Sequence, residues 1–184
     1  MRVISGEFRG RKLSAVPGDQ TRPTADKVKE SMFNMLGQQF GGGAALDLYA
    51  GTGALGIEAV SRGMAHATLV DKQFAAIKTI RANIALTRAP ERFTVLKAPV
   101  DRALTQLGAA HAQFDLIMAD PPYAKQEVLA QLAAFLELDL IAPGGRVLLE
   151  TGLDVDYPEA IPGYNQLRLQ KYGVAQVLIL ERGE

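Results

Sequence analysis

The sequence of 184 residues contains no cysteine and only two histidines, His66 and His111. Without thiols the chain has no disulfide, no thiolate nucleophile and no cysteine-rich zinc site, and two histidines do not suggest a metal centre. No apolar run is long enough to cross a bilayer, and the N-terminus lacks the apolar core of a signal peptide. We therefore expect a cytoplasmic protein without a metal or a membrane partner, and nothing in the sequence indicates a state other than monomer.

Charge is balanced over the whole chain but unevenly distributed. The net charge is zero, yet residues 1–29 hold seven Lys or Arg against three acidic residues. Such a surplus is typical of a terminus that meets an anionic partner, although a solvated basic terminus is an equally simple interpretation. If the partner is a nucleic acid, the candidates for phosphate contacts are Arg9, Arg11, Lys12 and Arg22.

The hydrophobic pattern after residue 43 alternates between strands and helices. Strands are predicted at 44–50, 67–71, 93–96, 114–119 and 146–150, with helices up to Arg62 and over 73–88, 100–107 and 125–138. Two last strands, 166–171 and 174–181, lack an intervening helix and should pair antiparallel. Before this region, residues 2–16 predict two short strands or a hairpin, and a helix runs from Pro23 and Thr24 towards Phe40.

Strands that are apolar throughout and separated by helices predict a mostly parallel sheet covered on both faces. We expect an α/β protein with a three-layer α/β/α, Rossmann-like architecture, whose seven-stranded sheet contains one antiparallel strand. Residues 41–184 form this domain, and residues 1–40 form a basic N-terminal extension, a hairpin plus a helix, packed on it. Ligands of such sheets bind beyond the carboxyl ends of the strands, where the strand order reverses.

A glycine loop follows the first predicted strand. Gly51 and Gly53 allow a tight turn and a close approach of a ligand to the backbone, and Asp71 ends the next strand twenty residues after Gly51. This spacing also fits a dinucleotide site, so a nicotinamide or flavin enzyme is one interpretation. Asp47, an acid inside the apolar strand, instead favours a cationic or amine-bearing ligand above the loop.

The fourth predicted strand ends in Asp120, Pro121, Pro122 and Tyr123. Adjacent prolines hold the backbone extended and direct carbonyl groups in a fixed geometry, and Asp120 adds an acceptor. Tyr123 offers a flat face on which a flipped base can stack, a contact worth about 1–3 kcal/mol. These four residues are therefore suited to bind an aromatic amine. The alternative interpretation is that they only form a rigid turn, in which the tyrosine packs against the protein.

An exocyclic amino group on a nucleobase is a poor nucleophile because its lone pair is delocalised into the ring. Hydrogen bonds to Asp120 and to the carbonyl of Pro121 would orient that lone pair and accept developing positive charge. A methyl group on a sulfonium is already activated towards attack. Alignment of the amine with that methyl group therefore supplies most of the rate enhancement that the protein must still provide. Since the chain has no cysteine, a thiolate route to C5 of a pyrimidine is closed.

Four segments carry a resemblance to one family. They are GEFRGRKL at residues 6–13, TRPTADKVKES at 21–31, DLYAGTGALGIEA at 47–59 and DPPY at 120–123. With these segments in this order, the chain resembles the RsmD-like bacterial 16S rRNA (guanine-N2) methyltransferases over nearly its whole length. The last two segments also occur in other amino-methyltransferases, whereas the first two are particular to this family.

The resemblance implies a methyltransferase fold, S-adenosyl-L-methionine as the methyl donor and one guanine of 16S rRNA as the target, within an assembling 30S particle. It places Asp120, Pro121, Pro122 and Tyr123 around the guanine. The cofactor-binding candidates are Asp47, Ala50, Gly51, Thr52, Gly53, Asp71, Lys72 and Asp101. Asp101 stands one turn after the position at which the family often has Asp or Asn near the adenine of the donor.

Three other functions remain open from the sequence. An N6-adenine methyltransferase acting on DNA or RNA would use the same four residues, Asp120 to Tyr123. A DNA enzyme, however, usually needs an inserted segment for target recognition, and every segment of this sequence is already assigned to the fold. A nicotinamide reductase has no catalytic Lys, Tyr or His placement to support it. A catalytically silent RNA-binding or assembly factor could keep the fold, but the intact glycine loop and Asp120 argue against it.

Overall fold

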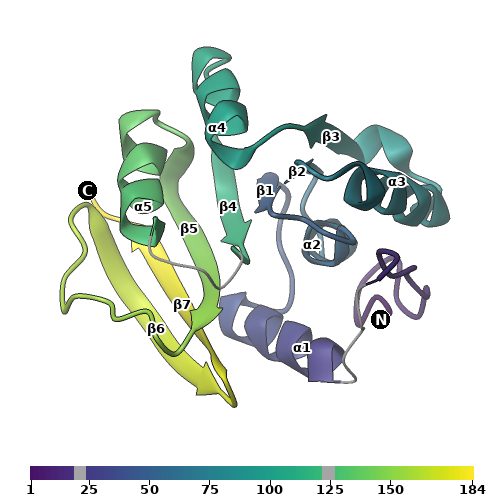
Figure 1. Ribbon diagram of the computed structural model, residues 1–184, viewed down its shortest axis with the longest axis horizontal. Coiled ribbons are helices and arrows are strands. Elements are labelled where there is room, and N and C mark those ends of the chain that lie inside the picture. Colours follow the sequence, from purple (N-terminus) through teal and green to yellow (C-terminus); the bar gives the residue numbers. More distant parts are fainter. Residues whose placement is uncertain (19–23, 122–126) are drawn as a thin grey trace.

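The computed structural model describes residues 1–18, 24–121 and 127–184, and a seven-stranded sheet crosses the molecule (Figure 1). Its strands lie in the order β3-β2-β1-β4-β5-β7-β6. They are β1 (Ala44–Leu48), β2 (His66–Asp71), β3 (Phe93–Lys97), β4 (Phe114–Ala119), β5 (Ile141–Gly152), β6 (Tyr164–Tyr172) and β7 (Ala175–Arg182). Only β7 runs against its neighbours, and β6 and β7 form the predicted antiparallel pair. The predicted sheet is confirmed.

Helices cover both faces of the sheet. Helices α1 (Thr24–Leu36), α2 (Ala54–Ser61) and α3 (Phe74–Thr87) share one core with the N-terminal segment, while α4 (Val100–Ala109) and α5 (Val128–Glu137) share the other. A 3₁₀ turn, η1 (Pro90–Arg92), precedes β3. Alternate strand residues face opposite layers, so Ala45 packs in the first core and Leu46 in the second. The three-layer architecture is therefore confirmed.

The order of the strands reverses between β1 and β4. From β1 the chain moves outward through β2 to β3, and it then returns to β4 on the other side of β1. The two strands pair in parallel with Leu48 opposite Ala119. The glycine loop and Asp120 therefore leave the sheet side by side, at the place where open α/β sheets bind their ligands.

Several boundaries differ from the sequence prediction. The N-terminal hairpin is reduced to one antiparallel bridge between Arg2 and Lys12. Helix α1 ends at Leu36 rather than near Phe40, because Gly37 adopts a left-handed φ of 111°. Strand β5 begins five residues before the predicted start at Arg146, with a register shift opposite Phe114 and Leu116 that absorbs the extra residues.

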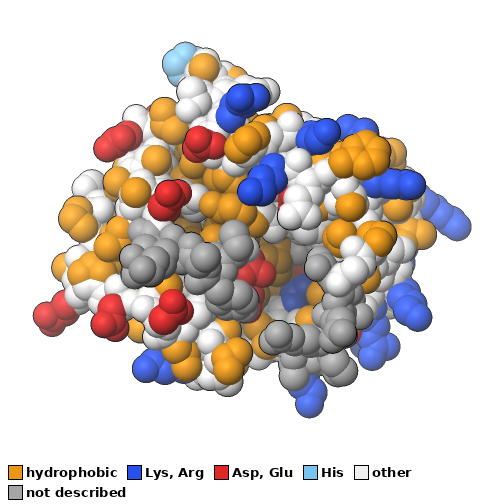
Figure 2. Space-filling view, in the orientation of Figure 1, with side chains coloured by type: hydrophobic (Ala, Val, Ile, Leu, Met, Phe, Trp, Pro, Cys, Tyr) orange, Lys and Arg blue, Asp and Glu red, His pale blue; other side chains and the backbone are white. Residues whose placement is uncertain are grey.

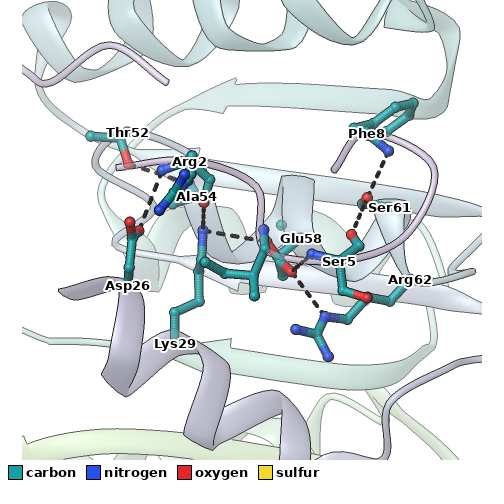
Figure 3. A network of polar contacts seen from close by, with 12 residues as sticks. Arg2, Ser5, Phe8, Asp26, Lys29, Thr52, Ala54, Glu58, Ser61 and Arg62 are labelled. Atoms are coloured by element: carbon teal, nitrogen blue, oxygen red, sulfur yellow. Dashed lines mark hydrogen bonds and ion pairs between the residues drawn. The ribbon is translucent and has the colours of Figure 1, made fainter. Parts of the chain in front are cut away.

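The N-terminal segment is fastened to α2 by buried polar contacts (Figure 3). Glu58 accepts hydrogen bonds from the backbone N–H groups of Ile4 (3.0 Å) and Ser5 (3.1 Å), and it pairs with Lys29 at 3.3 Å and Arg62 at 2.9 Å. Because an unpaired buried charge is costly, these contacts fix the position of the segment relative to α1 and α2.

Gly6 lies in the same contact. Its φ is +87°, and a Cβ atom at this position would lie 1.8 Å from the backbone oxygen of Ser61. The segment before α1 can therefore approach α2 this closely only with glycine at residue 6. This explains in structural terms why the segment at residues 6–13 begins with glycine.

Among the described residues, no helix combines the length and the hydropathy that a membrane span requires.

Candidate functional site

A cleft of about 1020 Å³ opens at the reversal point between β1 and β4. Its walls come from the glycine loop, α1, the end of the N-terminal segment, the carboxyl ends of β4 and β5, and the start of β7. Figure 2 looks onto this face, which is hollowed near its centre. Of the residues predicted for the site, Asp47, Ala50, Gly51, Thr52 and Asp120 line the cleft.

The glycine loop is held by the end of β2. One carboxylate oxygen of Asp71 accepts a hydrogen bond from the N–H of Gly51 at 3.0 Å, and the other accepts from the N–H of Gln73 at 2.9 Å. Gly51 has a φ of +59°, and a Cβ atom there would meet only the backbone oxygen of Tyr49, at 4.0 Å. The space above Gly51 is therefore open to a ligand that contacts the backbone.

Asp47 lies at the base of the cleft and is 1% exposed. It accepts a hydrogen bond from the N–H of Gly56, in the first turn of α2, at 2.9 Å. Burial raises the pKa of Asp47 to about 8, against the lowering effect of that hydrogen bond, and the negative charges of Asp120 and Asp71 add to the rise. A cation bound nearby would stabilise the ionised form.

Asp120 and Glu150 bring two further carboxyl groups to the cleft. The Asp120 side chain opens onto the cleft, but the surrounding protein removes enough water to raise its pKa to about 7, and the charge of Glu150 contributes. Burial also raises the pKa of Glu150. Pro121 is half-buried beside Asp120. Pro122 and Tyr123, predicted to hold the base, lie outside the described residues, as does Arg22.

Charged side chains of both signs line the cleft, because Lys27 and Lys29 lie there with the three carboxyl groups. Lys27 is exposed, whereas the ammonium group of Lys29 is occupied by Glu58 and by the backbone oxygen of Arg2, at 2.7 Å. In the described ranges, no group of three or more His, Asp or Glu residues is arranged to hold a metal ion. Three carboxyl groups with raised pKa values, beside apolar lining residues, suit an organic cation that also has apolar parts.

Four predicted cofactor residues are not among those that line the cleft, namely Gly53, Asp71, Lys72 and Asp101. Lys72 is exposed after β2, and Asp101 is exposed in the first turn of α4. Gly53 is the last residue of the glycine loop, directly before α2, and has a φ of +81°.

The basic residues of the N-terminal segment differ in their surroundings. Arg9 and Lys12 are exposed. Arg11 is half-buried, because its guanidinium donates to the backbone oxygen of Thr87 at 2.6 Å and lies over the ring of Phe8.

Sequence reasoning missed two polar residues that shape the site. Glu150 stands close to the carboxyl end of an apolar strand, as Asp47 and Asp120 do, and that pattern could have identified it. Asn83 is buried in α3, where its side-chain amide donates to the backbone oxygens of Thr52 (2.8 Å) and Ser14 (3.0 Å). A polar residue on the apolar face of a predicted helix was the available signal.

Comparison with known proteins identifies the family. A family model described as Conserved hypothetical protein 95 matches residues 1–181. The "Putative rRNA methyltransferase YlbH" of Bacillus subtilis is 41% identical, over 99% of this chain and 99% of that protein. The Ribosomal RNA small subunit methyltransferase D of Haemophilus influenzae is 30% identical, over 84% of this chain and 80% of that protein.

Among solved structures, the "Putative methyltransferase yhhF" of Escherichia coli matches with a TM-score of 0.85 and 29% identity, over 99% of this chain and 97% of that chain. The fold is thus shared with methyltransferases, as predicted. The chain belongs to the Conserved hypothetical protein 95 family, the RsmD-like family of ribosomal RNA methyltransferases that its four sequence segments indicate.

Proposed function

We propose that the protein transfers a methyl group from S-adenosyl-L-methionine to the exocyclic N2 amino group of one guanine in 16S rRNA. The reaction takes place in the cytoplasm, within an assembling 30S particle. The observation that carries this proposal is the position of Asp120, which follows β4 directly in a cleft shared with the glycine loop of β1.

The donor fits the glycine-loop side of the cleft. When bound, S-adenosyl-L-methionine supplies an activated methyl group on a positively charged sulfur. Asp47 offers a buried carboxyl group for the cationic part of this molecule, and the open surroundings of Gly51 let it approach the backbone. Asp71 holds the N–H of Gly51 and ends β2, where a carboxylate can also accept the ribose hydroxyl groups.

Asp120 is the residue that acts on the target amine. Its carboxylate accepts a hydrogen bond from one N–H of the amino group, and the carbonyl of Pro121 accepts a hydrogen bond from the other N–H. The lone pair of the nitrogen then points towards the methyl group. Nitrogen that gains a methyl group must lose a proton, and the carboxylate of Asp120 receives it. A pKa of about 7 suits this role, since an effective general base has a pKa near the working pH. Tyr123 stacks beneath the base.

The RNA backbone follows a basic face beside the cleft. Arg9 and Lys12 are exposed on the N-terminal segment, and Lys78, Arg81 and Arg88 are exposed on or directly after α3. The two parts are joined by the contact of Arg11 with Thr87 and by that of Asn83 with Ser14. In Figure 2, Lys and Arg side chains gather on this side of the molecule, over α3 and the N-terminal segment.

The affinity for S-adenosyl-L-methionine should increase as the pH rises towards 8 and level off above it. Below its pKa of about 8, Asp47 is protonated in the free protein, and binding of a cation lowers that pKa and releases a proton. Titration calorimetry at pH 7, in buffers with different ionisation enthalpies, would measure the release. Asp47→Asn should bind the donor more weakly and release fewer protons, whereas the exposed Asp154→Asn should match the wild type. Equal proton release in Asp47→Asn would contradict the assignment.

Neutralising Arg9 and Lys12 together, as Arg9→Gln and Lys12→Gln, should weaken RNA binding and flatten its salt dependence. Each lost phosphate contact lowers the slope of log K against log [salt] by about 0.7–0.9, so two should lower it by about 1.5. Filter binding of 16S rRNA between low and moderate salt would measure the slope. The matched control is Arg102→Gln with Arg168→Gln, two exposed charges on α4 and β6. Equal slopes in the two double variants would contradict the proposed surface.

The experiment that tests the function is methyl transfer from radiolabelled donor to unmodified 30S particles, free 16S rRNA and duplex DNA, followed by nucleoside analysis. We expect label in N2-methylguanosine, with more on particles than on free RNA. Label in N6-methyladenosine or N6-methyldeoxyadenosine would replace guanine with adenine as the target. Absence of label from every substrate would contradict the proposal and favour a silent assembly factor.

A further inference from the structure

Glu150 is a second carboxylate beside the proposed target amine. It lies near the end of β5, is half-buried and lines the cleft. Its carboxylate takes part in none of the ion pairs found among the described residues. A half-buried acid that lines a ligand cleft and forms no ion pair with the described residues points to contact with the ligand.

The register of the sheet places Glu150 next to Asp120. Strands β4 and β5 are parallel neighbours, with Ala119 opposite Leu149, so the following residues of the two strands are Asp120 and Glu150. Both line the same cleft, and the negative charge of Glu150 helps to raise the pKa of Asp120. The two carboxyl groups therefore face the same volume, and a group held by Asp120 has Glu150 beside it.

We propose that Glu150 selects guanine over other amine-bearing bases. Its carboxylate accepts a hydrogen bond from the N1–H group, which lies next to the amino group that is methylated. This inference rests on the proposed function. In guanine the amino group at N2 and the N1–H group point in the same direction along one edge, so two neighbouring carboxylates can accept from both. In adenine the amino group is flanked by N1 with a lone pair, which a carboxylate repels.

The same arrangement keeps both acids charged when the correct base is present. Two close carboxylates in a partly dry cleft disfavour each other's ionisation, whereas two N–H donors and a nearby cation favour it. Guanine together with the donor supplies all of these. A base with an acceptor at N1 supplies only one of the two N–H donors and leaves Glu150 facing a lone pair. Glu150 therefore contributes to specificity, while Asp120 contributes to the transfer itself.

A 2-aminopurine nucleotide tests this directly, because it keeps the amino group at C2 but has a lone pair at N1. Once the methylated guanosine is mapped, 16S rRNA carrying 2-aminopurine at that position can be prepared by ligation and reconstituted into particles. The wild-type protein should prefer guanosine by about 10- to 100-fold in kcat/KM. In Glu150→Gln the preference should fall below about threefold, because a carboxamide can accept from N1–H or donate to N1.

Glu137→Gln, an exposed change of the same type on α5, should keep the wild-type preference. A wild-type protein that methylates both nucleotides equally would overturn the proposal without reference to any variant. An unchanged preference in Glu150→Gln, or equal losses on both nucleotides, would also overturn it. Failure of the proposed function has a different signature, since wild-type protein would then leave guanosine unmethylated at N2.

Discussion

Replacing Asp120 with alanine should lower kcat for methyl transfer by about 100- to 1000-fold, the usual effect of removing one group that stabilises developing charge. The change removes the proposed hydrogen-bond acceptor of the target amine, which is also the proposed acceptor of its proton. Asp120 follows the end of β4 and opens onto the cleft, so its removal leaves both hydrophobic cores intact. Donor affinity and the unfolding midpoint should therefore stay close to those of the wild type.

Two comparisons sharpen this expectation. Asp120→Asn keeps an oxygen acceptor but cannot take a proton, so its loss of kcat should be smaller than that of Asp120→Ala. Wild-type kcat/KM for the RNA should rise with pH through about 7 as the carboxyl group of the free protein ionises, and this rise should be absent in Asp120→Asn. The exposed Asp154→Ala serves as the matched control. Single-turnover assays on 30S particles provide the measurement, and turnover of Asp120→Ala within tenfold of the wild type would contradict the mechanism.

The sheet and the position of the cleft could be predicted because their signals are local. Apolar runs separated by amphipathic segments identify parallel strands wherever they occur, and the carboxyl ends of such strands meet at one edge. Asp47 and Asp120 stand out because each interrupts or ends an apolar strand. Glu150 belongs to the same pattern, yet its proximity to Asp120 follows from the pairing of β4 with β5, which is a long-range property.

Element ends were harder to predict because tertiary contacts decide them. The apolar face expected for α1 reaches Phe40 in the sequence, but the backbone N–H of Phe40 donates to the oxygen of Arg62 instead, and the helix ends earlier. Similarly, the N-terminal segment satisfies the N–H groups of Ile4 and Ser5 with Glu58 rather than with a facing strand. Neither partner is close in the sequence.

The count of basic residues was also an incomplete guide to the proposed RNA surface. Lys29 is one of the seven basic residues near the N-terminus, but it is buried and paired with Glu58. Arg11 is half-buried against the end of α3. Part of the charge surplus therefore holds the N-terminal segment in place. Separating structural cations from exposed ones required the packing of α1, α2 and α3 around that segment.

Gly53→Val should abolish detectable binding of S-adenosyl-L-methionine. Gly53 has a φ of +81°, which a β-branched residue adopts only under strain, and its Cβ atom would lie 3.0 Å from Cδ2 of Leu69. Its backbone oxygen accepts the first hydrogen bond of α2, from Ile57 at 2.9 Å. The backbone can relieve the strain only by rotating the loop that contains Gly51 and Thr52, both of which line the cleft.

The control for Gly53→Val is Gly144→Val in β5. Gly144 has a similar φ of +71°, but no atom lies within 4 Å of the position of its Cβ. Both variants should lose about 1–3 kcal/mol of stability in denaturant titrations, the usual cost of such a backbone conformation. Only Gly53→Val should lose donor binding in calorimetry. Equal affinity in the two variants would mean that the donor does not depend on the conformation of the glycine loop, and its binding site would then have to be sought on another wall of the cleft.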